Sequence, residues 1–167
     1  MARDWDAQTY DRVADPQARW GRAVLDRLPL AGDERVLDAG CGTGRVTELL
    51  AARLPHGHVV ALDASAAMIE AAHQRLAPFG ERIEYAVADL GQPLPLAEPV
   101  DAILSTATFH WIADHDALFA ILGAHLDRLP ADERDAFVRA VADRLPEPVI
   151  DYVRLNIVAR GSRRSRH

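Results

Sequence analysis

Three glycines at alternate positions follow an acidic residue in the run from Val36 to Gly44. A short apolar stretch leads into Asp38, and a helical pattern begins directly after Gly44. Glycine accepts positive φ and lets a ligand approach the backbone, and a helix N-terminus presents unpaired N–H groups. N–H donors beside a carboxylate suit a zwitterion or a cation better than a bare phosphate. The run therefore predicts a loop that binds a small molecule.

Two further acids stand where later strands are expected to end. Asp63 closes the apolar run His58–Asp63, and Asp89 follows the alternating run Arg82–Val87. A carboxylate at such a position can accept two hydrogen bonds from a diol. A single acid there is equally well explained as a helix cap or a solvated turn. Because Asp38, Asp63 and Asp89 end successive strands, a shared site explains the set better than three separate caps.

The rest of the chain supplies elements that would hold these acids at one edge of a sheet. Strand patterns alternate with helical patterns, which is typical of an α/β fold with a parallel sheet and helices on both faces. Right-handed crossovers then bring the carboxyl ends of the strands together at the site. The predicted strands are residues 35–39, 58–63, 82–87, 100–106 and 149–159. The predicted helices are residues 16–28, residues 45–54, one from about residue 116, one from about residue 130, and one that Ser65 caps and that buries Met68, Ile69, Ala72 and Leu76.

The glycine run resembles motif I of the class I S-adenosylmethionine (SAM) dependent methyltransferases, acid-x-Gly-x-Gly-x-Gly. The strand before it and the helix after it supply the context that the motif requires. Two other interpretations stay open: a glycine-rich turn without a ligand, and a nicotinamide or flavin loop. The latter has the spacing G-x-G-x-x-G, and here the third glycine comes one residue earlier. The resemblance implies a Rossmann-like three-layer sandwich with a mainly parallel sheet, shortened to about five strands.

The resemblance also implies which residues surround SAM. Asp63 would bind the ribose hydroxyls, and Asp89 would contact the adenine amino group. Tyr10 would lie near the methionine end, in an N-terminal lid, although a purely structural role for Tyr10 is equally open. The other residues assigned to the cofactor are Asp38, Gly40, Cys41, Gly42 and Gly44 of the loop, Ala64 and Met68 on one side of the adenine, Leu90 on the other, and Thr106 at the end of the fourth strand.

The segment after the fourth strand, Ala107–Ile112, resembles the trans-aconitate methyltransferase-like group, which acts on small molecules, and so does Trp5–Tyr10. A carboxylate acceptor is already a nucleophile, whereas a phenol, amine or hydroxyl can need a base, for which His110 is the candidate. The simpler interpretation of His110 is a histidine that packs beside Trp111. The Asn/Asp-Pro-Pro-aromatic motif of amino-methylating nucleic-acid enzymes is absent from the sequence. A small-molecule acceptor, with a carboxylate as first candidate, is therefore expected.

Composition narrows the function classes. The 167 residues are 49% hydrophobic and 26% charged with a net charge of −6, which fits a soluble domain and argues against a general nucleic-acid binder. One cysteine allows no internal disulfide, no apolar run reaches membrane-helix length, and no signal peptide opens the chain, so a cytoplasmic location is expected. The histidines lack helical zinc spacing, the 114–116 cluster suits a helix start, and no metal is expected.

We expect a single domain over residues 1–160, followed by a basic, disordered tail over residues 161–167. The resemblance ends near residue 120. Members of the family then carry a Pro-Gly-Gly turn, a fifth strand, more helix and a sixth strand, and this sequence shows none of them. Residues 122–160 instead resemble the end of the trans-aconitate-like group. The chain is thus interpreted as a methyltransferase without one internal segment.

This interpretation leaves the structure and the function open in two respects. The last strand is expected either to pair beside the fourth or to leave an apolar edge that invites a homodimer. The function is either methyl transfer to a small acceptor or, alternatively, binding of SAM or S-adenosylhomocysteine (SAH) without efficient turnover. An oxidoreductase is the weaker third option, because the glycine spacing disfavours it.

Overall fold

The computed structural model describes residues 21–125 and 159–160. Residues 21–25 are helical. The elements that follow are β1 (Arg35–Ala39), α3 (Arg45–Ala52), β2 (His58–Asp63), α4 (Ala66–Leu76), the 3-10 helix η1 (Ala77–Arg82), β3 (Ile83–Val87), β4 (Ala102–Leu104), the 3-10 helix η2 (Phe109–Trp111), α5 (His115–His125) and β5 (Ala159–Arg160). Over these residues, no helix is long and apolar enough to cross a membrane.

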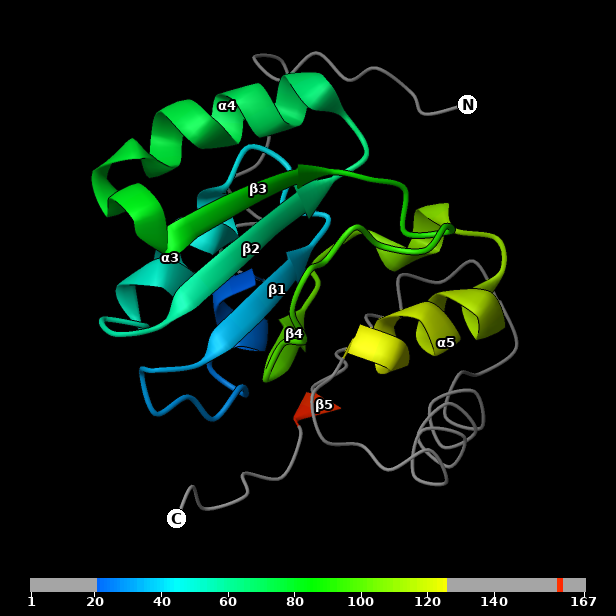
Figure 1. The fold of residues 1–167 in the computed structure, drawn as a ribbon, viewed down its shortest axis with the longest axis horizontal. Helices are drawn as coiled ribbons and strands as arrows, with labels where there is room; N and C mark the ends of the chain where they lie inside the picture. Colours follow the sequence, from blue (N-terminus) through cyan, green and yellow to red (C-terminus); the bar gives the residue numbers. More distant parts are fainter. Residues whose placement is uncertain (1–20, 126–158, 161–167) are drawn as a thin grey trace.

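A sheet of five strands in the order β3-β2-β1-β4-β5 forms the centre of the described structure (Figure 1). β1 pairs in parallel with β2 and β4, and β2 pairs in parallel with β3. β5 is two residues long and antiparallel to β4, with Ala102 opposite Arg160. The predicted Rossmann-like arrangement with a mainly parallel sheet is confirmed. Of the two placements expected for the end of the chain, the structure has the one beside the fourth strand.

The first two strands match the prediction residue for residue, whereas the fourth is shorter than expected. Residues 100–106 were predicted, and β4 spans Ala102–Leu104. The backbone leaves the sheet after this strand, because Ala107 has a φ of 56°. Several predictions fall on residues that the structure does not describe. They are the N-terminal lid with Tyr10, the helix near residue 130, most of the last strand, and the tail.

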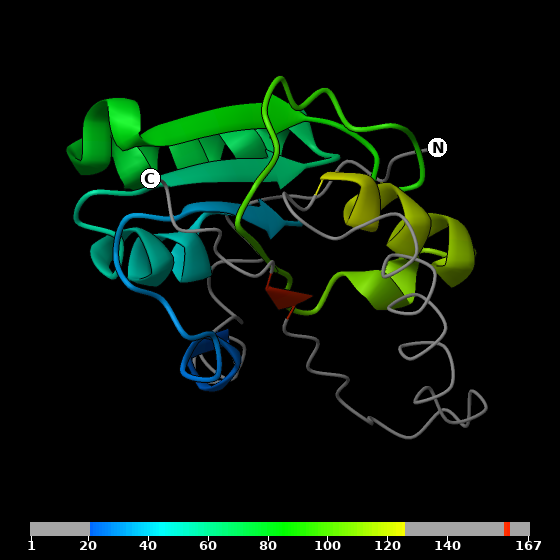
Figure 2. The same ribbon diagram turned by 60° about the horizontal axis from the view of Figure 1, so that its bottom comes forward.

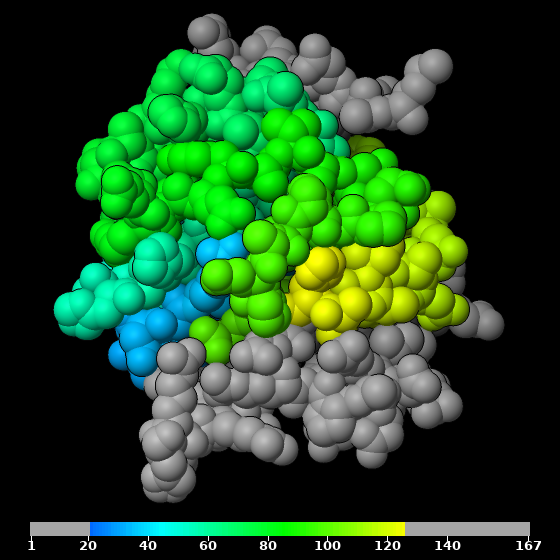
Figure 3. Space-filling view, in the orientation of Figure 1, coloured from blue at the N-terminus to red at the C-terminus, as the bar shows by residue number. Residues whose placement is uncertain are grey.

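Alternate strand residues face two separate cores, which gives the three layers. Val36, Val59 and Ala61 pack on the side of α3, α4 and residues 21–25. Leu37 and Leu62 face α5 and the β3–β4 connection. Figure 2 shows α3 and the first helix (blue) below the strands, and Figure 3 shows the connection (green) beside α5 (yellow) on the opposite face.

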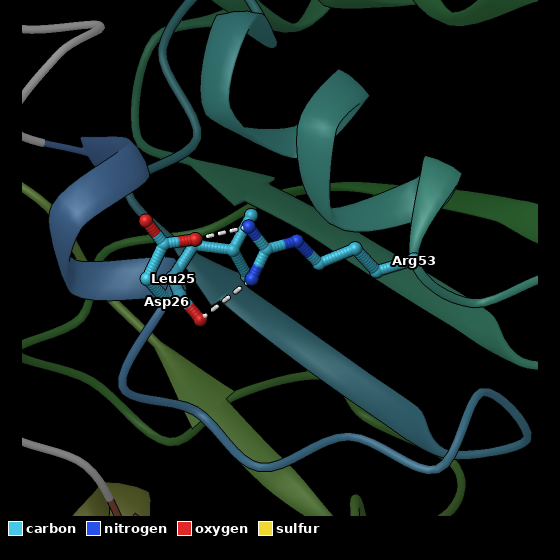
Figure 4. Close-up of polar contacts among 3 residues, drawn as sticks. All are labelled: Leu25, Asp26 and Arg53. Atoms are coloured by element: carbon cyan, nitrogen blue, oxygen red, sulfur yellow. Dashed lines mark hydrogen bonds and ion pairs between the residues drawn. The ribbon is translucent and has the colours of Figure 1, made fainter.

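Arg53, directly after α3, fastens that helix to the first one. Its guanidinium donates a hydrogen bond to the carbonyl oxygen of Leu25 at 3.1 Å and forms an ion pair with the Asp26 carboxylate (Figure 4). The Leu25 carbonyl also accepts a hydrogen bond from the Leu28 N–H at 3.1 Å, so Arg53 is its second donor at the end of the first helix. The C-terminal end of α3 is thereby fixed, and its N-terminal end carries the glycine loop.

Candidate functional site

The glycine loop joins β1 to α3 and folds over the end of β2. Its three glycines have positive φ: 84° at Gly40, 55° at Gly42 and 81° at Gly44. The N–H groups of Gly40 and Cys41 both donate to the carbonyl oxygen of Leu62, at 2.8 and 2.9 Å. These contacts place the loop at the carboxyl edge of the sheet, toward which β1, β2 and β3 point in Figure 1. This is the edge where open α/β sheets bind ligands.

The three glycines have different spatial constraints. A Cβ on Gly40 would come within 2.2 Å of Thr108 Oγ1, and one on Gly44 would come within 3.1 Å of Leu76 Cδ1. A Cβ on Gly42 would meet nothing within 4 Å. Packing therefore requires a glycine at position 40, whereas at Gly44 a Cβ would be tight against Leu76 and Ala72. Gly42 borders open space, as expected where a ligand approaches the backbone.

Substituting Gly40 and Gly42 separately should distinguish packing from ligand binding. Gly40→Ala adds a clash with Thr108 to the cost of positive φ, so we expect it to lower the free energy of unfolding by more than about 2 kcal/mol. Gly42→Ala bears the backbone cost alone, about 1 kcal/mol, but it fills the open space and should abolish ligand binding. Urea denaturation and calorimetric titration with SAH measure the two effects. Equal stability losses would contradict this distinction.

Asp63, at the end of β2, ties the glycine loop to the start of α4. Its Oδ2 accepts a hydrogen bond from the Gly42 N–H at 2.9 Å, and its Oδ1 accepts one from the Ser65 N–H at 2.9 Å. Ser65 is the N-cap of α4, as predicted, and its side chain accepts from the Met68 N–H. Asp63 is half-buried, and each carboxylate oxygen keeps a further lone pair for a ligand.

Asp38, in β1, is buried beneath the loop. Its Oδ2 accepts a hydrogen bond from Thr47 Oγ1 at 2.7 Å, whereas no described residue bonds its Oδ1. Burial raises the pKa of Asp38 to about 7; the Thr47 hydrogen bond opposes this rise, and the charge of Asp63 adds to it. A buried carboxylate oxygen without a donor is costly, so this atom calls for a donor or a cation from a ligand.

Cys41 shares this environment without contributing a reactive group. Burial raises the pKa of its thiol well above the usual value, and the charges of Asp38 and Asp63 raise it further. The thiol therefore stays protonated and neutral. Because the thiolate is the nucleophilic form, Cys41 is not a reactive group. The same two carboxylates make the loop region electronegative and favour a ligand with positive charge.

The remaining predicted cofactor residues lie in different environments. Asp89 is exposed at the carboxyl side of β3, where its Oδ1 accepts from the Gly91 N–H at 2.8 Å in a turn. Leu90 is buried in the core that faces α5, and Met68 is buried in the first turn of α4. Ala64 is exposed and Thr106 is half-buried. Tyr10 lies outside the described residues.

His110 and Trp111 lie side by side in η2, and both are exposed. Their ring centroids are 4.8 Å apart, which agrees with the packing interpretation of His110. Partial burial lowers the pKa of His110, so the ring is neutral and able to accept a proton at pH 7. Asp114 accepts a hydrogen bond from the Ala117 N–H at 2.9 Å and so caps α5. Within the described ranges, no three potential ligands gather for a metal ion.

Four residues that support the site were not predicted from the sequence. Thr47 bonds Asp38, and Arg75 donates from α4 to the carbonyl oxygen of Thr43 at 2.9 Å. Ser105 and Thr108, after β4, reach the end of β1 and the glycine loop. For Ser105 and Thr108 the sequence held one signal, a cluster of hydroxyl residues directly after an apolar strand at the expected binding edge.

Comparison with known proteins identifies the family. Residues 36–129, more than half of the chain, match the family model described as a methyltransferase domain. The chain belongs to this methyltransferase family. A trans-aconitate 2-methyltransferase of Azoarcus sp. is 41% identical over 122 residues, covering 73% of this chain and 46% of that protein. One of Variovorax paradoxus is 34% identical over 164 residues, covering 91% of this chain and 62% of that protein.

A solved structure supports the same assignment. The S-adenosylmethionine-dependent methyltransferase from Clostridium acetobutylicum has a TM-score of 0.59 and 26% identity, covering 73% of this chain and 52% of that one. The resemblance to class I SAM-dependent methyltransferases of the trans-aconitate group is thus confirmed. This methyltransferase chain spans about half the length of the Azoarcus relative.

Proposed function

We propose that this methyltransferase chain binds SAM along the glycine loop and transfers a methyl group to a small acceptor that carries a carboxylate. The observation that carries the proposal is the Oδ1 atom of Asp38, which is buried under the loop and has no donor among the described residues. SAM has an ammonium group, a sulfonium charge and a ribose diol, and this donor set fits an electronegative site with unused carboxylate lone pairs.

Each of three residues has a distinct role in this proposal. Asp38 would accept from the ammonium group, Asp63 would accept from the ribose hydroxyls with its remaining lone pairs, and Gly42 would let the ligand approach the backbone. When bound, SAM supplies an electrophilic methyl group. The chain therefore has to bind, orient and exclude water, and it needs no nucleophile of its own. Asp89, Leu90, Ala64, Met68, Thr106 and Tyr10 remain proposed contacts of the adenine and methionine ends.

The carboxylate class of acceptor is supported by the relatives, which are named for trans-aconitate. A carboxylate is ionised at neutral pH and reacts without a base. We expect His110→Gln to change the rate of transfer to trans-aconitate by less than about threefold, because this acceptor has no proton to lose. With a hydroxyl acceptor, loss of a general base should cost about 100-fold or more. Initial rates with both acceptor types measure the difference, and a large loss with trans-aconitate would contradict the base-free reaction.

The alternative function is SAM or SAH binding without efficient turnover. Both functions require the cofactor residues of the loop, which are all present in the sequence, and they differ only on the acceptor side. Four other expectations also stay predictions. They are a single domain that ends at residue 160, a cytoplasmic location, a homodimer, and the lack of nucleic-acid or membrane partners.

Calorimetric titration of the full chain with SAM and SAH, followed by mass spectrometry of trans-aconitate incubated with SAM, tests the proposal. Saturable binding and an acceptor heavier by one methyl group would support the enzyme. Binding without a methylated product, across a panel of small carboxylates, would support the alternative. A folded chain that binds neither compound would refute both.

A further inference from the structure

The segment after β4 is bonded to the end of β1 through side chains. The parallel ladder of these strands ends at the pair Asp38 and Leu104. Beyond it, Ser105 Oγ donates a hydrogen bond to the carbonyl oxygen of Ala39 at 2.6 Å. Thr108 Oγ1 lies 3.3 Å from the carbonyl oxygen of Gly40 and 3.1 Å from that of Thr106, so these two acceptors share its one proton. Two hydroxyl groups thus reach two consecutive carbonyls at the start of the glycine loop.

Packing and backbone conformation strengthen this connection. The Thr108 side chain occupies the space where Gly40 would carry a Cβ, with Oγ1 and Cγ2 at 2.2 and 2.4 Å from that position. Between the two hydroxyl residues, Ala107 has a φ of 56°, and it is the only non-glycine residue of the described ranges with positive φ. Such a conformation is unfavourable for alanine and persists only where its surroundings hold it.

The connection leads directly into η2, which carries the exposed aromatic side chains. Trp111 is 62% exposed and His110 packs against it. The other side of η2 is held by α5: Phe109 and Phe119 make an edge-to-face contact with centroids 5.8 Å apart, and His115 Nε2 lies 3.0 Å from the carbonyl oxygen of Phe109. η2 is therefore fixed between α5 and the glycine loop.

We propose that Ser105 and Thr108, here called the hydroxyl latch, are positioning residues that set η2 at a fixed place relative to the glycine loop. The latch joins the proposed cofactor side to the side on which an acceptor would meet His110 and Trp111. Binding at the loop is thereby transmitted to η2. The part of this inference that concerns the acceptor rests on the proposed function, whereas the contact between latch and η2 does not.

The test is the double variant Ser105→Ala, Thr108→Val in the full chain, with Gln74→Ala, an exposed change on α4, as the control. The amides of Trp111 and Ile112 bond the carbonyls of Thr108 and Phe109, so hydrogen exchange at these amides reports on η2. We expect exchange in the ligand-free protein to rise about fivefold, as for the loss of one hydrogen bond. SAH should slow this exchange in the wild type and not in the variant.

The second readout is methyl transfer from SAM to trans-aconitate. Misplacement of η2 should lower kcat about tenfold while the KM for SAM and the affinity for SAH stay within about threefold of wild type. Unchanged exchange at Trp111 and Ile112, or an unchanged kcat, would overturn the proposal. If the double variant fails to fold, Ser105→Ala alone gives the same readouts.

The design separates this inference from the proposed function. If the wild type binds no SAH, the proposed function fails, and exchange in the ligand-free protein still decides whether the latch holds η2. Ala107→Gly keeps both hydroxyls and removes the unfavourable φ, so its melting temperature should equal or exceed that of the wild type. A lower melting temperature would contradict the strain at Ala107.

Discussion

Replacing Asp63 by alanine is expected to weaken SAH binding by at least about 100-fold, since two hydrogen bonds from ribose hydroxyls to a carboxylate are worth roughly 3 kcal/mol or more. The variant has a second effect, because Asp63 also accepts from the N–H groups of Gly42 and Ser65. Removing the Asp63 carboxylate leaves these two N–H groups without their acceptor, so the glycine loop at Gly42 and the start of α4 are held less firmly. The loss of affinity should therefore exceed the loss expected from the ligand contacts alone.

Asp101→Ala is the matched control for this variant. Asp101 also accepts a hydrogen bond from a backbone N–H, that of Arg35 at 2.9 Å, but it lies before β4, away from the glycine loop. Both variants should lose comparable stability in urea denaturation, and only Asp63→Ala should lose affinity in calorimetric titration. An Asp63→Ala protein that binds SAH with wild-type affinity would remove the basis of the proposed cofactor site.

Replacing Asp38 by asparagine is expected to change stability and binding in opposite directions. The pKa of Asp38 is about 7 in the folded chain, against an ordinary value of 3.8. Below pH 4 both the folded and the unfolded chain hold the proton. Between pH 4 and 7 only the folded chain holds it, so stability falls as the pH rises, by roughly 4 kcal/mol in total. At pH 8 the buried Asp38 carboxylate is ionised in the wild type. The asparagine of the Asp38→Asn variant cannot ionise, so the variant should be more stable than the wild type at this pH.

Ligand binding should show the reverse pH dependence. An ammonium group favours the ionised form of Asp38, so SAH affinity of the wild type should rise about tenfold between pH 6 and 8 as the proton is released. The Asp38→Asn variant should bind weakly and without this rise. Urea denaturation and calorimetric titration at pH 5, 6, 7 and 8 measure both effects. Parallel pH profiles of stability in the two proteins would show that Asp38 titrates normally.

The local features of this chain followed from its sequence. β1 and β2 were predicted to the residue, because each apolar run is bounded by an acid or a glycine that ends the strand pattern. Ser65 was predicted as the cap of α4, since a hydroxyl before an apolar helical pattern satisfies a free N–H. The glycine spacing predicted the loop and the family. These features depend on neighbours within a few residues, which a sequence displays directly.

The end of β4 and the details of the site did not follow from the sequence. The strand was predicted to run to Thr106, yet β4 ends at Leu104 and the backbone turns away at Ala107 with positive φ. Asp89 and Asp63 are both aspartates at the carboxyl side of a strand. Asp89 is exposed and accepts a hydrogen bond within a turn, whereas Asp63 accepts one from Gly42 in the glycine loop. Local pattern cannot separate the two, because burial and partners depend on what packs against each strand end.

The sequence by itself thus determined the fold class, the glycine loop, and Asp38 and Asp63 as its acids. Only the tertiary structure decided that Asp38 is buried with an oxygen that no described residue bonds, and that Thr108 fills the space beside Gly40. It also decided that the short β5 lies antiparallel beside β4. Each of these facts joins segments far apart in the chain. They arise from desolvation and close packing, which exist only once the chain is folded.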